Sequence, residues 1–237
     1  MDPLAPKTDL KDDVLARLRA EILSLALPPG APLKQAVLAD ALGVSRQPVS
    51  HALEVLKRDR LVVERGRRGL CVASLDPGRI AALYAVRGAL DGLAARLAAA
   101  RRPRRAALAA LDTALAAGRA AIAAADAPGL LRADIAFHEG LYALSGNAEI
   151  APAAGSVWPE LSRGMAALLR APGFPRAAWD EHAAIRAAVA AGDPEDAGAL
   201  AERHCASAAA RSAARLTAAP AAPDAPDTPG APRQDED

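Results

Sequence analysis

From Lys34 to Leu56 the chain reads KQAVLADALGVSRQPVSHALEVL, and this stretch decides the fold of the amino-terminal part. Two segments with apolar residues at helical spacing flank the turn Gly43-Val44-Ser45. Ser45 is a favourable N-cap residue for the second helix, because its side chain can accept a hydrogen bond from the first turn. Two short helices around such a turn predict a helix-turn-helix. We expect the first helix to bury Val37, Leu38 and Ala41, and the second to bury Val49, Ala52, Leu53 and Leu56.

The residues on either side of this stretch complete a larger unit. A preceding helix is predicted at about 10–27, because apolar residues recur there at helical spacing until Pro28-Pro29-Gly30 interrupts them. Two β-prone runs follow at 61–64 and 70–73, with a turn rich in Gly and Arg between them. Three helices and a β-hairpin wing within residues 1–75 predict a winged helix-turn-helix.

The helix after the turn has the polar side chains that contact with DNA requires. A helix in the major groove needs such side chains at its amino end, facing the base edges. Arg46 can pair with guanine or a phosphate, and Gln47 can pair with adenine. At the wing tip, Arg67 and Arg68 suit phosphates or a narrow minor groove. The residues predicted to contact double-stranded operator DNA are Lys34, Ser45, Arg46, Gln47, Ser50, His51, Arg67 and Arg68.

The composition bounds the class of protein. A chain of 237 residues is long enough for two modest domains, and its wealth of Ala, Leu and Arg favours helices. The net charge is only +1, so any basic surface has to be local. Cys71 and Cys205 are far apart and have no second Cys at metal-ligand spacing, so we expect neither a disulfide framework nor a zinc ribbon. The charged start and the absence of a long apolar run predict a cytoplasmic protein without a membrane segment.

The second part of the chain is predicted to be helical. Asp76-Pro77-Gly78 marks a domain boundary, since it combines an N-cap residue with helix breakers. Beyond it, apolar periodicity with Pro and Gly breaks predicts helices at about 79–101, 103–125, 129–144, 149–169, 174–191 and 194–216. They predict an all-α antiparallel bundle over 76–216, and the fold class is therefore mainly α. Residues 217–237 hold hardly any large apolar side chain, so we expect a disordered tail.

Histidine is scarce, and three of the four histidines lie in the second part. Asp134 and His138 are four residues apart on one predicted helix, so they share a face, as paired metal ligands do. His182 and His204 belong to two later helices. If those helices converge, three imidazoles and one carboxylate can hold a divalent cation and leave positions open for water or a ligand. Zinc (Zn2+) is the first expectation for that cation, with nickel (Ni2+) or manganese (Mn2+) next.

The amino-terminal motifs, taken together, resemble the DNA-binding domain of the GntR family of bacterial regulators. The resemblance is carried by LPPG at 27–30, LA at 38–39, LGVSRQPV at 42–49, AL at 52–53 and GRRG at 66–69. Two departures stand out: Ser50 replaces a usual Arg, and Lys34-Gln35-Ala36 replaces a frequent Ser-Glu-Arg. The resemblance implies operator binding, and the departures bear on which operator sequence is recognised.

The helical part resembles the FCD ligand-binding domain of the FadR subfamily. The resemblance is carried by DIAFH at 134–138 with SGN at 145–147, EHAAI at 181–185 with GD at 192–193, and ERH at 202–204. In metal-binding members the Asp and three His of these segments are ligands, which implies the ligand set Asp134, His138, His182 and His204 here. Arg87, within LYAVR at 83–87, matches an arginine that points into the same cavity. A guanidinium beside a cation suits a carboxylate-bearing effector, because both select carboxylate oxygens.

These inferences predict a transcription regulator, with a repressor as the first expectation. It would bind a palindromic operator as a homodimer under the control of a small organic acid. Two other interpretations stay open. In the first, the Asp and three His form a hydrolytic metalloenzyme, although the nearest carboxylates, Glu139 and Glu181, should point off the ligand face. In the second, the helical part only dimerises, without metal or effector.

Overall fold

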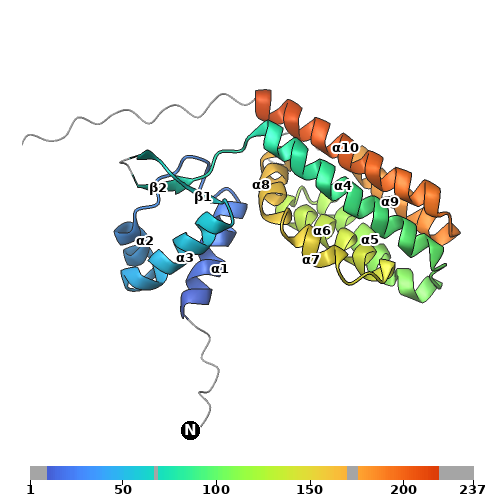
Figure 1. The fold of residues 1–237 in the computed structure, drawn as a ribbon, viewed down its shortest axis with the longest axis horizontal. Helices are drawn as coiled ribbons and strands as arrows, with labels where there is room; N and C mark the ends of the chain where they lie inside the picture. The colour runs from blue at the N-terminus through green and yellow to red at the C-terminus, as the bar shows by residue number, and fades with distance from the viewer. Residues whose placement is uncertain (1–9, 67–68, 170–175, 219–237) are drawn as a thin grey trace, which may run out of the picture.

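The computed structural model describes residues 10–66, 69–169 and 176–218 (Figure 1). Within these ranges a small amino-terminal unit with a two-stranded sheet precedes a larger helical bundle. This architecture confirms the predicted fold class, a mainly α protein with an amino-terminal winged helix-turn-helix. The amino-terminal elements are α1 (Leu10–Leu23), α2 (Gln35–Leu42), α3 (Arg46–Arg58), β1 (Val62–Glu64) and β2 (Leu70–Val72).

The amino-terminal core forms where α3 packs against α1. All four residues of α3 that are expected to be buried lie in this core: Val49, Ala52, Leu53 and Leu56. Helix α1 contributes Val14, Leu18 and Ile22. The expected inward face of α2 is wrong in two places, since Val37 is 60% exposed and Ala41 is exposed, while Ala39 is buried. Apolar residues occupy both sides of this two-turn helix, so periodicity alone does not fix the side that faces the core.

The predicted wing is an antiparallel hairpin. Its register pairs Val62 with Val72, Val63 with Cys71 and Glu64 with Leu70. Gly66 and Gly69, at the ends of the turn, have φ values of 51° and 85°, a conformation that glycine adopts without steric cost. Arg67 and Arg68, which the sequence assigns to DNA contact, lie outside the described residues.

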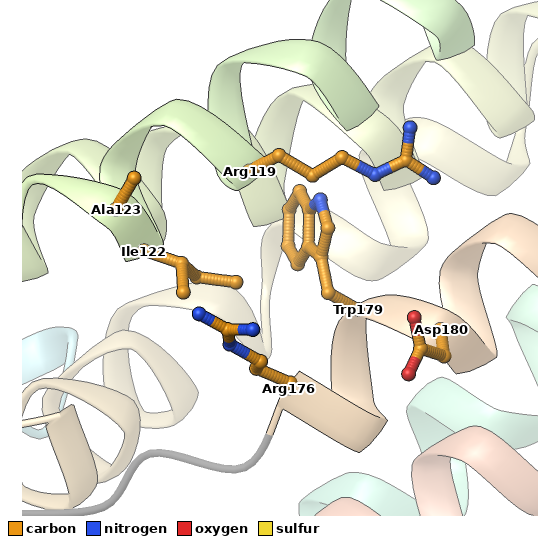
Figure 2. Close-up of a pocket in the computed structure, with 6 residues that line it drawn as sticks. All are labelled: Arg119, Ile122, Ala123, Arg176, Trp179 and Asp180. Carbon is orange, nitrogen blue, oxygen red and sulfur yellow. The ribbon is translucent and has the colours of Figure 1, made fainter.

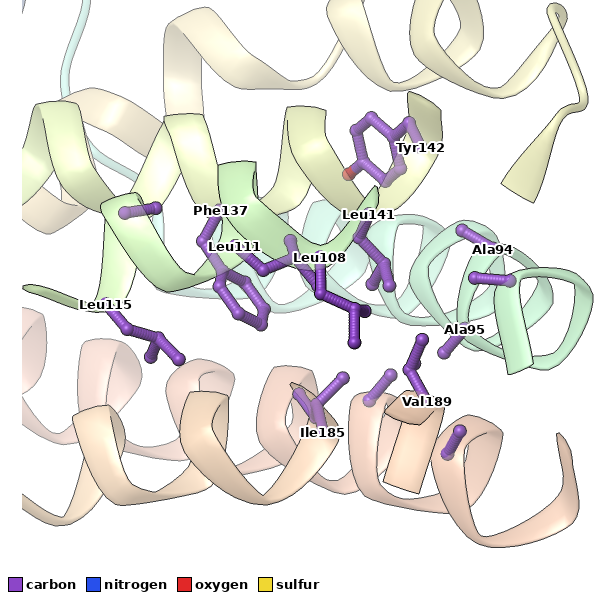
Figure 3. Close-up of a cluster of buried hydrophobic side chains, with 14 of the residues drawn as sticks. Ala94, Ala95, Leu108, Leu111, Leu115, Phe137, Leu141, Tyr142, Ile185 and Val189 are labelled. Atoms are coloured by element: carbon purple, nitrogen blue, oxygen red, sulfur yellow. The ribbon is translucent and has the colours of Figure 1, made fainter. Parts of the chain in front are cut away.

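The bundle comprises α4 (Pro77–Ala100), the 3-10 helix η2 (Arg105–Leu108), α5 (Ala109–Ala123), α6 (Ala127–Ser145), α7 (Ile150–Gly155), α8 (Trp158–Leu169), α9 (Arg176–Ala191) and α10 (Pro194–Ala218). The long helices α4 and α10 pack lengthwise against each other. The apolar core lies between α5, α6 and α9, where Leu111 and Phe137 face Ile185 and Val189 (Figure 3).

The single helix predicted at 149–169 is wrong, because this segment forms the two helices α7 and α8. Proline explains the break. Pro159 has no N–H to donate, and inside a continuous helix its ring would clash with the carbonyl of Gly155. In the first turn of α8 the missing N–H is harmless. At the other end of the bundle, α10 continues to Ala218, and residues 219–237 of the expected tail lie outside the described residues.

One described segment, Arg105–Ala123, is long and apolar enough to cross a membrane by length and composition alone. This criterion is weak, because core helices satisfy it equally. Its apolarity comes largely from alanine, and α5, which makes up most of the segment, packs against α6 and α9.

Helix α8 joins the bundle to the amino-terminal unit. The buried guanidinium of Arg163 donates a hydrogen bond to the backbone carbonyl of Ala73, just after the wing. Glu160 forms a bidentate pair with Arg79 at the start of α4, with both N···O distances at 2.5 Å. Helix α1 also contacts α8. The same helix therefore contacts the first helix, the end of the wing and the start of the bundle.

Candidate metal centre and DNA-contacting surface

The four side chains that the sequence singles out as metal ligands converge inside the bundle. Asp134 and His138 come from α6, His182 from α9 and His204 from α10. Each offers one ligand atom, and these four atoms all lie within 4.8 Å of one another. All four residues are buried, with exposed fractions of 5% or less. The sequence could place Asp134 and His138 on one face, and the packing of α9 and α10 supplies the other two.

The spacing of the ligand atoms fits a small divalent cation. In a tetrahedral site with metal–ligand distances near 2.0–2.1 Å, ligand atoms are about 3.3 Å apart. Here Nε2 of His182 lies 3.3 Å from Oδ1 of Asp134 and 3.1 Å from Nε2 of His138. Nε2 of His138 lies 3.9 Å from the same Oδ1. The cluster could therefore hold a metal ion.

The protonation states also suit a cation. Burial lowers the pKa of all three imidazoles below the ordinary histidine value, which favours the neutral form that binds metals. Burial alone would raise the pKa of Asp134, but a hydrogen bond from His182 and nearby positive groups outweigh it, so the pKa lies well below its usual range. Oδ2 of Asp134 and the Nδ1 atoms of His138 and His182 are buried without a hydrogen-bond partner among the described residues.

Carboxylates lie next to the outer nitrogens of two imidazoles. Oε2 of Glu181 lies 2.8 Å from Nδ1 of His204, and Arg211 pairs with the same carboxylate at 3.0 and 3.1 Å. Burial raises the pKa of Glu181, but these hydrogen bonds outweigh it and bring the pKa to about 2. Oδ2 of Asp91 lies 3.1 Å from Nδ1 of His138. Such partners orient metal-binding imidazoles so that the other nitrogen faces the ion.

Arg87, the predicted effector residue, borders the same cluster. Its Nη2 lies 3.6 Å from Oδ2 of Asp134 and has no hydrogen-bond partner in the described part of the chain. Its Cζ lies 4.2 Å from the ring centroid of Trp158, a cation–π contact. Burial lowers the pKa of Arg87, but Asp91 and neighbouring acidic groups raise it above its ordinary value, so the guanidinium stays charged.

Sequence reasoning missed Asp91, and it did not assign Glu181 to the outer nitrogen of His204. Asp91 contacts both Arg87 and His138, at 3.2 and 3.1 Å. A signal for it was present, because Asp91 follows Arg87 by four residues on one helix and so shares its face. Glu181 precedes His182, and its contact with His204 depends on where α10 lies, which spacing within α9 does not encode.

A separate cavity of about 320 Å³ lies between α5 and α9 (Figure 2). Its lining consists of Arg119, Ile122, Ala123, Arg176, Trp179 and Asp180. The indole of Trp179 donates a hydrogen bond to the carbonyl of Leu115 at 2.9 Å. Its ring centroid also lies 4.6 Å from that of His182. Trp179 therefore lies between this cavity and the metal-ligand cluster.

The residues assigned to DNA contact lie at the amino end of α3 and the start of α2. Lys34, Ser45, Arg46, Gln47 and His51 are exposed, and Ser50 is half-buried. Ser45 occupies the N-cap position as expected, but its side chain makes no capping hydrogen bond. The opposite side of α3 is packed into the core, so its polar amino end is presented outward.

Known proteins share these two parts. The FCD domain matches residues 82–207, and the bacterial regulatory proteins of the gntR family match residues 10–72. An uncharacterised HTH-type transcriptional regulator in an unstable DNA locus of Streptomyces ambofaciens is 34% identical over 166 residues, 67% of this chain and 63% of that protein. An uncharacterised HTH-type transcriptional regulator in the TAR-I ttuE-ttuC' intergenic region of Agrobacterium vitis is 38% identical over 128 residues, 53% of this chain and 75% of that protein.

Solved structures share the fold. A GntR transcriptional regulator from Rhodococcus sp. RHA1 is 29% identical, with a TM-score of 0.74 over 90% of this chain and 100% of that one. McbR/YncC of E. coli is 22% identical, with a TM-score of 0.71 over 89% of this chain and 98% of that one.

The fold and the relatives define the class of this protein, a helix-turn-helix transcription regulator and not an enzyme. The chain belongs to the GntR family of bacterial regulators and has its FCD domain. The alternative of a hydrolytic metalloenzyme is therefore wrong.

Proposed function

We propose that the protein is a cytoplasmic repressor that binds a palindromic operator as a homodimer and is released from it by a carboxylate-bearing effector at a metal centre. The observation that carries the proposal is a buried cluster of three imidazoles and a carboxylate beside Arg87, whose Nη2 has no hydrogen-bond partner among the described residues. Helix α8 links the bundle that holds this cluster to an exposed helix-turn-helix. We assign residues 1–75 to DNA binding and 76–216 to effector binding and dimerisation.

For the DNA-binding surface we assign base contacts to the exposed amino end of α3. Arg46 and Gln47 are exposed in its first turn, where side chains of a recognition helix meet base edges. Lys34, Ser45, Ser50 and His51 surround them, and Arg67 and Arg68 are assigned to the wing tip. Phosphate contacts set the position of the protein on the duplex, whereas any base contact from Arg46 or Gln47 sets sequence preference.

For the metal we propose Zn2+ first, with Ni2+ or Mn2+ as alternatives. Asp134, His138, His182 and His204 would hold it, because three neutral imidazoles and one carboxylate are a donor set that zinc accepts. When bound, the ion would supply a Lewis-acidic position for an oxygen ligand. Oδ2 of Asp134 and Nη2 of Arg87 lie 3.6 Å apart, and neither atom has a hydrogen-bond partner among the described residues, so both keep hydrogen-bonding capacity next to the cluster.

The buried charges select the effector class. The two carboxylates Asp91 and Asp134 face one guanidinium, Arg87, so with neutral imidazoles the cluster has a net charge of −1. A divalent cation changes this to +1, which leaves one uncompensated positive charge in a buried site. Buried charge is costly unless it is paired. A monocarboxylate that reaches both the ion and Arg87 restores neutrality, and this supports a small organic acid as effector.

For the homodimer we propose an apolar ridge on α4 as the interface. The ridge consists of Ala82, Val86, Ala89 and Leu93, which recur at helical spacing on the exposed side of α4. Val86 is 52% exposed and Leu93 is 42% exposed, which is unusual for large apolar residues on a bundle. An isologous contact along this ridge would pair two helix-turn-helix units, as a palindromic operator requires.

Two measurements test the proposal. Purified without a His-tag, the native chain should contain close to one equivalent of metal, and a His182→Ala/His204→Ala variant should contain none. The variant His51→Ala, an exposed histidine outside the cluster, is the matched control and should keep its metal. In gel-shift assays, the native chain should retard DNA from upstream of its own gene, and candidate carboxylates should weaken retardation only of the metal-loaded protein. If the native chain contains no metal, the result would instead support the alternative in which the helical part only dimerises.

A further inference from the structure

Three hydrogen-bond donors and one imidazole nitrogen surround the carboxylate of Asp91, which is completely buried on α4. Its Oδ1 accepts a hydrogen bond from the hydroxyl of Tyr142 at 2.5 Å. Its Oδ2 accepts from the thiol of Cys205 at 3.1 Å and from Nε of Arg87 at 3.2 Å. The same Oδ2 lies 3.1 Å from Nδ1 of His138.

Two of these groups belong to the metal-ligand cluster and to the proposed effector site. His138 presents Nε2 to the cluster while its Nδ1 lies 3.1 Å from Asp91, the acceptor placed to orient the ring. Arg87 directs Nη2 toward Asp134 while its Nε donates to Asp91. Since a single oxygen contacts both groups, the orientation of one depends on the other.

Close helix packing leaves this carboxylate little freedom. A Cβ atom at Gly88 would lie 3.2 Å from the Cβ of Cys205, so α4 and α10 approach closely one turn before Asp91. A carboxylate fixed in this way can orient two neighbours at once.

We propose that Asp91 is the positioning residue shared by the metal centre and the effector site, and that it sets the affinity of both by orienting His138 and Arg87. This inference rests on the metal centre of the proposed function. It adds a residue outside the four ligands, whose loss should weaken metal and carboxylate binding together.

The decisive variant is Asp91→Asn, which keeps the shape of the side chain and removes its charge. Zn2+ affinity is measured by competition with a chromophoric chelator, and we expect it to fall by roughly 10–100-fold, the usual effect of losing an outer partner of a metal ligand. The visible spectrum of the Co2+-loaded chain should also change, because His138 no longer keeps its orientation. In the same Co2+-loaded protein, acetate titrated as a carboxylate probe should bind at least several-fold more weakly.

Two further variants keep the test sharp. Asp112→Asn, at an exposed carboxylate paired with Arg186 on α5 and α9, is the matched control and should leave all three measurements unchanged. Tyr142→Phe removes one hydrogen bond to Asp91 but retains its charge, so we expect a smaller loss of Zn2+ affinity, roughly 2–5-fold. If Asp91→Asn does not fold, Tyr142→Phe still tests the role of Asp91.

The outcomes distinguish a failure of the role of Asp91 from a failure of the metal centre itself. If folded Asp91→Asn keeps native Zn2+ affinity and an unchanged acetate titration, the role of Asp91 is overturned and the metal centre stays intact. If Asp91→Asn does not fold, unaltered Zn2+ affinity in Tyr142→Phe has the same consequence. A native chain that binds neither Zn2+ nor Co2+ would overturn the metal centre and this inference together.

Discussion

The guanidinium of Arg163 in α8 donates a hydrogen bond to the backbone carbonyl of Ala73, 90 positions earlier in the chain. Arg163 is 1% exposed, and its Nε has no hydrogen-bond partner among the described residues. Burial lowers its pKa below the ordinary arginine value. A buried cation is costly to retain, and replacing it with an apolar side chain of similar size is often neutral for stability. Its contact with the segment after the wing therefore points to a role in joining the two parts of the protein.

We expect Arg163→Met to loosen the connection without unfolding the bundle. Methionine fills a similar volume, so the melting temperature should change by only a few degrees. The carbonyl of Ala73 loses its partner, and the segment 73–77 should be cleaved several-fold faster by thermolysin, because proteolysis follows local opening. Arg186→Met, which removes an ion pair with Asp112 far from the junction, should leave this cleavage rate unchanged. Equal rates for Arg163→Met and the native chain would contradict the prediction.

Gly118 in α5 provides the space for Trp179, and even a methyl group there should destabilise the bundle. A Cβ atom at Gly118 would lie 1.7 Å from Cζ2 of Trp179, and the indole is held in place by Leu115. We expect Gly118→Ala to lower the free energy of unfolding by about 2–3 kcal/mol or more, as overpacking does. It should also weaken metal binding, because the displaced indole packs on His182.

The matched control for this substitution is Gly155→Ala in α7. A Cβ atom at Gly155 would meet nothing within 4 Å, so Gly155→Ala should be neutral or stabilising by up to about 1 kcal/mol. Urea unfolding followed by circular dichroism measures both variants, and equal stabilities would refute the packing argument.

Features that depend on residue spacing within one helix or strand were predictable from the sequence. The polar amino end and apolar face of α3 follow from the spacing of Val49, Ala52, Leu53 and Leu56, all of which are buried. The pairing of Asp134 with His138 follows from their spacing on one helix. The wing follows from two β-prone runs separated by glycines.

Features that depend on how helices meet were not predictable from the sequence in the same way. The inward side of α2 is decided by its contact with α3 and not by its own two turns. The break before α8 was encoded by Pro159, but a continuous apolar pattern concealed it. Asp91 looks like an ordinary surface acid four residues after Arg87, and only the packing of α6 and α10 on α4 surrounds it with donors.

The ridge on α4 leads to a prediction about assembly. Val86→Asp places a charge at the centre of the proposed interface and should convert the dimer to monomers, because an unpaired buried charge is costly. Sedimentation velocity at micromolar concentration measures the change. Ala117→Asp tests the other apolar face, an alanine-rich groove between α5 and α6, and should leave the dimer intact. If Ala117→Asp forms monomers and Val86→Asp does not, the interface lies on the groove between α5 and α6 and not on the α4 ridge.

The exposed amino end of α3 leads to a prediction about DNA binding that does not require a known effector. If Arg46 contacts a phosphate, Arg46→Ala should weaken binding to all sequences and reduce the slope of log affinity against log salt concentration by about 1. If Arg46 pairs with a guanine, the same variant should cost about 1–3 kcal/mol on the specific site and little on random DNA. Fluorescence anisotropy at several salt concentrations, on upstream DNA and on a scrambled duplex, distinguishes these modes. Arg119→Ala, an exposed arginine on α5 of the bundle, should bind both duplexes like the native chain. If Arg46→Ala matches that control on both duplexes at every salt concentration, the amino end of α3 is not the DNA-reading surface.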